Sequence, residues 1–343
     1  MDTRWRVAAG CGLIALIFLF VQLGSLALVE PFKSAGYQAV EDPSDPANSV
    51  LYIVGILVAT AVMLLAFRYD AEQFIRGLIV LSGAWLSLYV FRVLVPPVVT
   101  AGGVNVLAVG CSVLLGLGLL LYPEWYVVDA AGAVMGAAAA GLFGISFGIF
   151  PAIVLLTVLA VYDAISVYGT EHMLTLASGV MDLKVPVVLV IPLTLSYSFL
   201  EASTPDPTAT AEESEPNAEA PGADVTDTDE SATSADDEGG SGPLDRDALF
   251  IGLGDAVIPT VLVASAAFFA PEGVRTVLGV PLPAMTAMVG TFVGLTVLLW
   301  MVLKGRAHAG LPLLNGGTIA GYILGAATVG IGLVEALGLG PYL

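Results

Sequence analysis

The chain has 343 residues, of which 57% are hydrophobic and 12% charged, whereas a soluble domain averages about a quarter charged residues. Its formal net charge is −19, so it lacks the basic surface that nucleic-acid binding requires, and that class of protein is excluded. Long stretches carry no charge, while half of the 30 acidic residues gather in residues 201–247. This distribution indicates a membrane protein with a polar insert.

The acidity has two interpretations. Carboxylates keep protein surfaces hydrated at high salt, so the excess of acid and the scarcity of lysine favour a halophilic source. The alternative is that an acidic disordered loop accounts for most of the charge. Full activity without added salt would contradict the halophile hypothesis.

The apolar segments predict an all-α polytopic membrane protein with nine transmembrane helices. A helix needs about 20 apolar residues to cross the hydrocarbon core. The first segment follows two arginines, as a signal peptide would, but it is too long for one and is expected to remain as a helix. The nine segments are residues 7–29, 51–67, 74–95, 104–122, 129–148, 150–168, 249–270, 282–303 and 313–338.

Lys and Arg residues gather in alternate loops, which predicts the orientation because cytoplasmic loops carry the excess of positive charge. The expected protein is a multi-pass protein of the cell membrane, with its N-terminus in the cytoplasm and its C-terminus outside. The inside set is Arg4, Arg6, Arg68, Arg76, Lys184, Arg246, Lys304 and Arg306, against an outside set of Lys33, Arg92 and Arg275.

The segments divide the chain into four parts: a six-helix membrane part (1–168), a semi-apolar segment (169–200), an acidic cytoplasmic loop (201–247) and a three-helix membrane part (248–343). In the second part, five β-forming residues between two prolines predict a short extended strand over residues 187–191. The acidic loop buries too little apolar surface to fold, so it is expected to be disordered.

Metal and cofactor chemistry is not indicated. Cys11 and Cys111 lie in apolar segments without metal-ligand spacing, so they are expected to be small buried hydrophobic residues. The sequence also lacks a phosphate-binding glycine loop and a Ser-His-Asp set. We therefore expect neither a metal nor a cofactor.

Two carboxylates are predicted to lie inside the membrane, where an acid is costly and usually functional. Asp163 falls in the second half of the sixth segment and Asp255 in the first half of the seventh, so both lie toward the cytoplasm. Consecutive helices can pack as neighbours, and we expect the two side chains to face each other. The remaining acids are assigned to loops or helix ends, among them Glu124, Asp129 and Glu335.

Two neighbouring carboxyl groups cannot both ionise easily, so such a pair shares one proton. One member then acts as a general base toward water, and the other donates a hydrogen bond to the scissile carbonyl. The residues around Asp255 suit a site, because Gly252 and Gly254 are expected to let another backbone come close. Pro259 has no N–H, so the Asp255 carbonyl loses its helical partner.

Tyr162-Asp163 and Gly252-Leu253-Gly254-Asp255, on consecutive helices of a nine-helix chain, resemble the presenilin and signal-peptide-peptidase family of intramembrane aspartyl proteases, and its archaeal members in particular. The resemblance implies that Asp163 and Asp255 are catalytic, with Tyr162, Gly252, Leu253 and Gly254 in support. The predicted orientation agrees with the presenilin branch.

The family's third motif is Pro-Ala-Leu at the start of the last helix. The matching position is Pro312-Leu313-Leu314, where Leu313 replaces the alanine and adds bulk. The resemblance implies that this segment lies near the aspartates and helps to position the substrate.

The substrates implied are transmembrane segments or remnant signal peptides, with the lipid bilayer as the other partner; no oligomeric state is indicated. A transmembrane helix must unwind before it is cut, because its peptide groups are hydrogen-bonded. We expect Val187, Val188 and Leu189 of the predicted strand to position the unwound chain by β-addition. The alternative is a strand that packs only within the protein.

Two other functions fit part of this pattern. A prepilin-type aspartyl peptidase also carries a Gly-x-Gly-Asp motif, but its acids lie nearer the cytoplasmic surface. A proton- or cation-coupled transporter or a channel would also use membrane aspartates and broken helices. Proteolysis of a membrane substrate separates these transport functions from a protease.

Overall fold

The computed structural model describes residues 3–69, 71–169, 186–194, 197–199, 248–304 and 309–340. The acidic loop predicted to be disordered, 201–247, lies outside the described residues, as does most of the semi-apolar segment before it. The fold of the described chain is largely helical, as the apolar segments predicted.

Nine helices of 16 residues or more occur in the described part of the chain, at the nine predicted places. Six of them are long and apolar enough to cross a membrane, and two apolar helices, α4 and α9, are shorter. The helices are α1 (Thr3–Ser34), α2 (Ala47–Arg68), α3 (Glu72–Leu94), α4 (Val106–Leu121), α5 (Trp125–Ser146), α6 (Ile149–Gly169), α9 (Leu253–Phe268), α10 (Leu282–Val302) and α11 (Gly310–Thr328).

Several predicted helix boundaries were wrong by four residues or more, and two of them change the kind of structure that is present. The seventh segment was predicted to be helical from residue 249, but Ala248–Gly252 forms a strand, β4, and α9 begins only at Leu253. The ninth was predicted to run to residue 338, but α11 ends at Thr328. Gly330 follows with φ +80°, a left-handed conformation that ends helices, and the short α12 (Leu333–Ala336) comes after it.

The strand predicted between the two prolines is present as β3 (Val188–Pro192), and it pairs antiparallel with β4. Val188 lies opposite Gly252, and Val190 lies opposite Phe250. The Leu253 N–H donates to the Val187 carbonyl at 2.8 Å, which extends the pairing into the start of α9. Two short hairpins also join helices: β1 (Thr100–Ala101) with β2 (Val104–Asn105), and β5 (Thr276–Val277) with β6 (Val280–Pro281).

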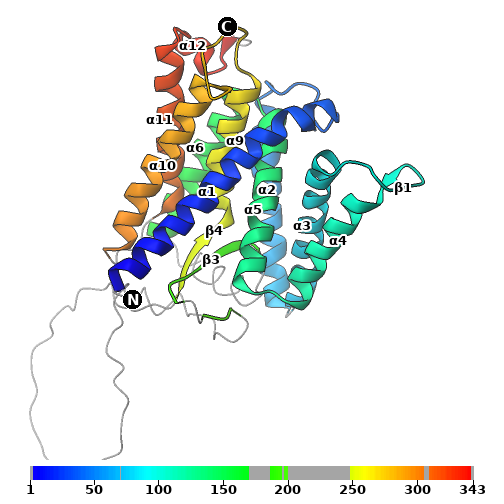
Figure 1. The fold of residues 1–343 in the computed structure, drawn as a ribbon. Coiled ribbons are helices and arrows are strands. Elements are labelled where there is room, and N and C mark those ends of the chain that lie inside the picture. The colour runs from blue at the N-terminus through cyan, green and yellow to red at the C-terminus, as the bar shows by residue number, and fades with distance from the viewer. Residues whose placement is uncertain are drawn as a thin grey trace, which may run out of the picture.

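The β3–β4 sheet lies at the end of the bundle where α1 begins, and the C-terminal end of the chain lies at the opposite end (Figure 1). Its apolar side chains belong to the core: Leu189 and Ile191 pack in one cluster with Phe18 of α1, Leu295 of α10 and Leu314 of α11. The sheet is therefore built into the membrane bundle and is not a surface appendage.

Helices α10 and α11 pack with their backbones in close contact. A Cβ on Gly290 or on Gly317 would collide with the carbonyl oxygen of the other. These are two of the small residues that recur at four-residue spacing, a pattern that allows helices to approach closely in lipid. The contact fixes the start of α11 beside the sheet end of the bundle.

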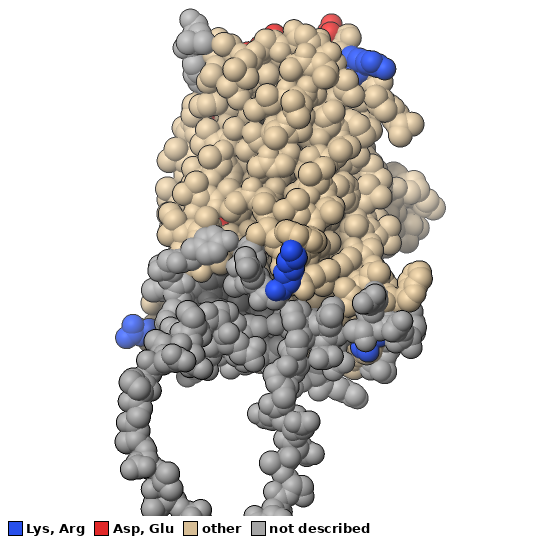
Figure 2. All heavy atoms as spheres, turned by 90° about the vertical axis from the view of Figure 1, so that its left-hand side faces the viewer, with Lys and Arg blue, Asp and Glu red and all other residues tan. Residues whose placement is uncertain are grey.

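The outer surface fits a membrane. On the face drawn in Figure 2, the Lys and Arg side chains lie toward the two ends, and the band between them has none. Helix α2 exposes large apolar side chains along its length, including Val50, Leu57 and Leu65. The protein is thus a multi-pass integral membrane protein, in which apolar exposure is directed to lipid.

Candidate active site

Asp163 lies in α6 and is buried, with 7% of its surface exposed. Its Oδ2 accepts the Leu311 N–H at 3.0 Å, and the Gly310 N–H also binds this carboxyl group. Both donors belong to the first turn of α11, where N–H groups have no partner inside the helix. These bonds offset part of the cost of burying the carboxyl group.

Asp255 is held by the local geometry of its own motif. Gly252 is the N-cap of α9, and Asp255 is the third residue inside the helix. The Gly252 N–H donates back to the Asp255 carboxyl group, which is the backward bond of a capping box. The Gly-Leu-Gly-Asp sequence therefore marks the point where β4 ends and α9 begins, and it places an acid there.

The two carboxyl groups meet at the first turn of α11. Asp163 and Asp255 are close enough for the charge of one to act on the other. A Cβ on Gly310 would stand 3.6 Å from each carboxyl oxygen of Asp255, while the neighbouring Leu311 N–H binds Asp163. The structure thus brings together the two acids that the sequence placed at one depth.

The close backbone approach was expected at Gly252 and Gly254, and among the described residues it occurs elsewhere. A Cβ on Gly254 would meet only Ile258 of its own helix, and one on Gly252 would meet only Asp255. The close approach occurs at Gly310, where the first turn of α11 comes close to the Asp255 carboxyl group. The two motif glycines serve the strand-to-helix turn instead.

The other motif residues have separate environments. Tyr162 is 50% exposed, and no described residue forms a hydrogen bond with its hydroxyl group. Leu253 packs on α5, where its Cδ1 would lie 3.2 Å from a Cβ on Gly136. Pro259 is buried inside α9, one turn after Asp255, as the sequence predicted.

The segment assigned to the third motif, Pro312–Leu314, directly follows the turn of α11 that lies beside the acids. The Leu313 carbonyl packs on Gly294 of α10, and Leu314 is buried in the apolar cluster. Gly310 and Leu311, just before Pro312, make the contacts with the carboxyl groups. The sequence signal for them was a proline in the first turn of a helix, since the N–H groups beside it are free to bind an acid.

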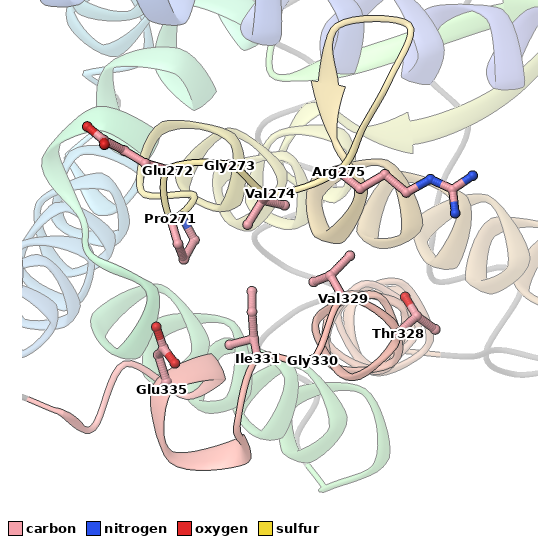
Figure 3. A pocket seen from close by; sticks show the side chains of 10 residues that line it. All are labelled: Pro271, Glu272, Gly273, Val274, Arg275, Thr328, Val329, Gly330, Ile331 and Glu335. Atoms are coloured by element: carbon pink, nitrogen blue, oxygen red, sulfur yellow. The ribbon is translucent and has the colours of Figure 1, made fainter.

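A separate hollow of about 440 Å³ lies between the α9–β5 loop, the end of α11 and α12. Val274, Val329 and Ile331 border it, while the Glu272 and Arg275 side chains point away from it (Figure 3). It lies at the end of the bundle away from β3 and β4, so it is not part of the aspartate site.

No metal group accompanies the acids: in the described ranges, no three His, Cys, Asp or Glu side chains gather as metal ligands. Cys11 and Cys111 are both free and only partly buried, although burial was expected. The geometry offers two facing carboxyl groups inside an apolar bundle, which is the arrangement that activates water for peptide hydrolysis. It defines the class of membrane-embedded aspartyl hydrolases.

Comparisons with known proteins agree with this class. The signal-peptide peptidase and presenilin aspartyl protease family matches residues 15–331. A solved presenilin family intramembrane aspartate protease, in space group C222, is 30% identical with a TM-score of 0.60, covering 94% of this chain and 99% of that one. A second structure under the same description, in space group P2, is 30% identical with a TM-score of 0.57, covering 91% and 96%. Among curated proteins, none matches the chain.

The chain belongs to the signal-peptide peptidase and presenilin family, and it is an intramembrane aspartyl protease. The resemblance read from the Tyr-Asp and Gly-Leu-Gly-Asp motifs is confirmed at the level of the family. The match spans α1 to the end of α11, so it includes every element that holds the two acids.

The contact at Gly310 leads to a prediction about side-chain size. A Gly310→Leu substitution should lower the cleavage rate about 100-fold, because its side chain fills the space in front of Asp255 and displaces a reacting group. Gly310→Ala should stay near the wild-type rate, since its Cβ makes ordinary contacts of 3.4 Å with Leu298 and 3.6 Å with Asp255. The measurement is the initial rate on a membrane-spanning peptide, normalised to folded protein.

Leu313→Ala is the matched control from the same helix turn. It removes bulk from a residue whose backbone packs on α10, so the normalised rate should change little. A wild-type rate for Gly310→Leu, or a loss in Leu313→Ala equal to that of Gly310→Leu, would contradict the assignment of Gly310 and Leu311 to the site.

Proposed function

We propose that Asp163 and Asp255 are the catalytic pair of this protease, and that it hydrolyses peptide bonds within transmembrane segments or remnant signal peptides. The observation that carries the proposal is that one turn, Gly310–Leu311, binds the Asp163 carboxyl group and faces the Asp255 carboxyl group, which a Cβ on Gly310 would contact. Two acids from α6 and α9 are thereby held at one point inside an apolar bundle, where an uncompensated carboxylate is costly.

The pair has the two functions that hydrolysis needs. In the proposed reaction, the ionised carboxylate takes a proton from water as the water oxygen attacks the scissile carbonyl carbon. The protonated partner gives its proton to the carbonyl oxygen, and the resulting tetrahedral diol collapses as the amine leaves with a proton. The shared proton belongs to the pair, so the titration is described jointly.

The first test replaces each acid with its amide. Asp163→Asn and Asp255→Asn should each lower cleavage of a reconstituted transmembrane peptide by about 100-fold or more, since each removes an acid–base group. Asp45→Asn, in the loop between α1 and α2, is the control and should keep the wild-type rate, because that carboxylate accepts the Ala47 N–H in a loop away from the two acids. Products are identified by mass spectrometry.

Cleavage by Asp255→Asn at the wild-type rate would overturn the assignment of the pair. If the wild type gives no cleavage and the two variants instead change proton or cation flux in the same vesicles, the transport interpretation replaces the protease.

Substrate binding by β-addition is the second part of the proposal, and β4 is the strand that has room for it. One edge of β3 pairs with β4, and its other edge faces α5 through the bond between Val190 and Asp129. On the outer edge of β4, no described residue forms a hydrogen bond with the Phe250 backbone. We propose that the unwound substrate pairs there, five residues before Asp255.

In this arrangement, Val187, Val188 and Leu189 position the substrate indirectly. They hold β4 on the edge opposite the proposed substrate, through strand pairing and through the hydrogen bond from the Leu253 N–H to the Val187 carbonyl. Direct pairing of the substrate with β3, as first expected, is disfavoured because both β3 edges are in use. Pro312 and the two leucines after it anchor the first turn of α11.

The edge proposal predicts a difference between two substitutions at one position. Phe250→Pro removes the outward N–H without breaking a β3–β4 hydrogen bond, a change that strand edges tolerate. Cleavage should fall about threefold to tenfold, as for one lost hydrogen bond. Phe250→Ala loses the same aromatic ring but keeps the N–H, so its rate should exceed that of the proline variant. Equal rates for the two would remove the β4 edge from substrate binding.

We further propose that all nine long helices cross the membrane, with the N-terminus in the cytoplasm and the C-terminus outside. The two ends of the described chain lie at opposite ends of the bundle (Figure 1), as an odd number of crossings requires. Cysteines introduced at Lys33 and Lys304 should then react with an impermeant reagent from opposite sides. A halophilic source stays part of the proposal, and activity without added salt is the measurement that bears on it.

A further inference from the structure

A third carboxyl group of the membrane bundle takes no part in the reaction proposed above. Asp129 was assigned to a helix end by the sequence, but it lies inside α5, which begins at Trp125, and only 6% of its surface is exposed. One carboxyl oxygen, Oδ2, is buried and has no partner among the described residues. Burying such a group is costly, so the presence of Asp129 at this position needs an explanation, and the hydrogen bond that it does form is the place to look.

Asp129 forms this hydrogen bond with the β3–β4 sheet. Asp129 Oδ1 accepts the Val190 N–H at 2.8 Å. In an antiparallel pair, successive residues direct their N–H groups to opposite edges. Leu189 and Ile191 direct theirs toward β4, so the Val190 N–H points the other way, to α5. Asp129 therefore holds the middle of β3 on the edge that β4 does not occupy.

The same face of α5 receives the start of α9. Gly132 and Gly136 stand one and two turns after Asp129. A Cβ on Gly132 would lie 3.3 Å from Leu189 and 3.8 Å from Leu253, and one on Gly136 would lie 3.2 Å from Leu253. One helix face thus sets the position of β3 through a hydrogen bond and the position of α9 through close packing.

Two more charged side chains hold the chain just after β3. Glu124, the N-cap of α5, accepts the Phe199 N–H at 3.0 Å and the Ser198 hydroxyl at 2.6 Å. Arg6 of α1 donates to the Leu193 carbonyl at 2.7 Å. The four bonds made by these three side chains go to residues 190–199, and Asp129 is the side chain that binds a strand residue.

We propose that Asp129 is a positioning residue that selects which peptide bond of the substrate is cut. The inference rests on the proposed function, in which the substrate strand adds to β4. Val190 lies opposite Phe250 in the sheet, and Asp255 follows five residues after Phe250. By holding Val190 against α5, Asp129 fixes the offset between the β4 edge and the catalytic pair. That offset determines which substrate bond lies over the pair.

The test is the distribution of products from one transmembrane peptide, measured by mass spectrometry, together with the thermal unfolding midpoint of each variant. Asp129→Ala should lower the rate of the main product about tenfold, as for a lost hydrogen bond, and should change the ratio of the products. Asp129→Asn keeps an oxygen acceptor for Val190 and should keep the wild-type ratio. A role confined to stability lowers all products equally, so the ratio separates positioning from folding.

Asp129→Glu covers the case in which the alanine variant does not fold. It keeps the carboxyl group and its acceptor oxygens but lengthens the side chain by one methylene, so the strand must shift and the ratio should change in a folded protein. Asp45→Ala is the matched control, since it removes another carboxylate that accepts a backbone N–H, at 2.8 Å from Ala47, far along the chain. Its ratio and rate should match the wild type.

A wild-type ratio in folded Asp129→Ala or Asp129→Glu would overturn the inference, and so would a changed ratio in Asp129→Asn. These outcomes differ from failure of the proposed function, in which the wild type gives no products or Asp163→Asn and Asp255→Asn keep cleaving.

Discussion

The structure depends on the cost of placing carboxyl groups inside an apolar bundle. Four acids at the sheet end of the bundle each accept a backbone N–H: Glu124 from Phe199, Asp129 from Val190, Asp163 from Leu311 and Asp255 from Gly252. The donors come from a strand, from the chain after it and from two helix N-termini, which are places where an N–H is free of helical bonding. Because each acid needs such a donor, residues 197–199, the sheet and the first turns of α9 and α11 are held close to the acids.

The sequence predicted that the two catalytic candidates lie at a similar depth. Depth follows from the position of a residue along its apolar segment, and it does not depend on which face of the helix the residue occupies. The sequence also predicted β3, since prolines bound a run of β-branched residues there. It missed β4, where Leu249, Phe250 and Ile251 continue the apolar composition of α9. A short apolar run has no pattern that separates strand from helix, and only pairing with β3, about 60 residues earlier, decides it.

Gly310 and Leu311 were missed for one reason, and Asp129 was missed for another. Gly310 and Leu311 act through backbone atoms, so their side chains carry no chemical signal, and the family motif begins directly after them at Pro312. Asp129 was missed because the predicted fifth helix began at that residue. The observed helix begins four residues earlier, which moves Asp129 from a helix end to the second turn, on the face that meets the sheet.

A buried acid holds a strand more specifically than apolar packing does. Leu189 and Ile191 bury equally well in an apolar cluster after the strand slips along its own axis by one residue without turning. The Val190 N–H adds a condition that the slipped strand cannot meet. After such a slip, the neighbouring N–H groups remain directed at β4, and Asp129 is left buried without a donor, at a cost of about 1 to 3 kcal/mol or more. The same bond that makes Asp129 tolerable in the membrane therefore selects one register of β3. Because β4 continues directly into α9, that register also determines where Asp255 stands.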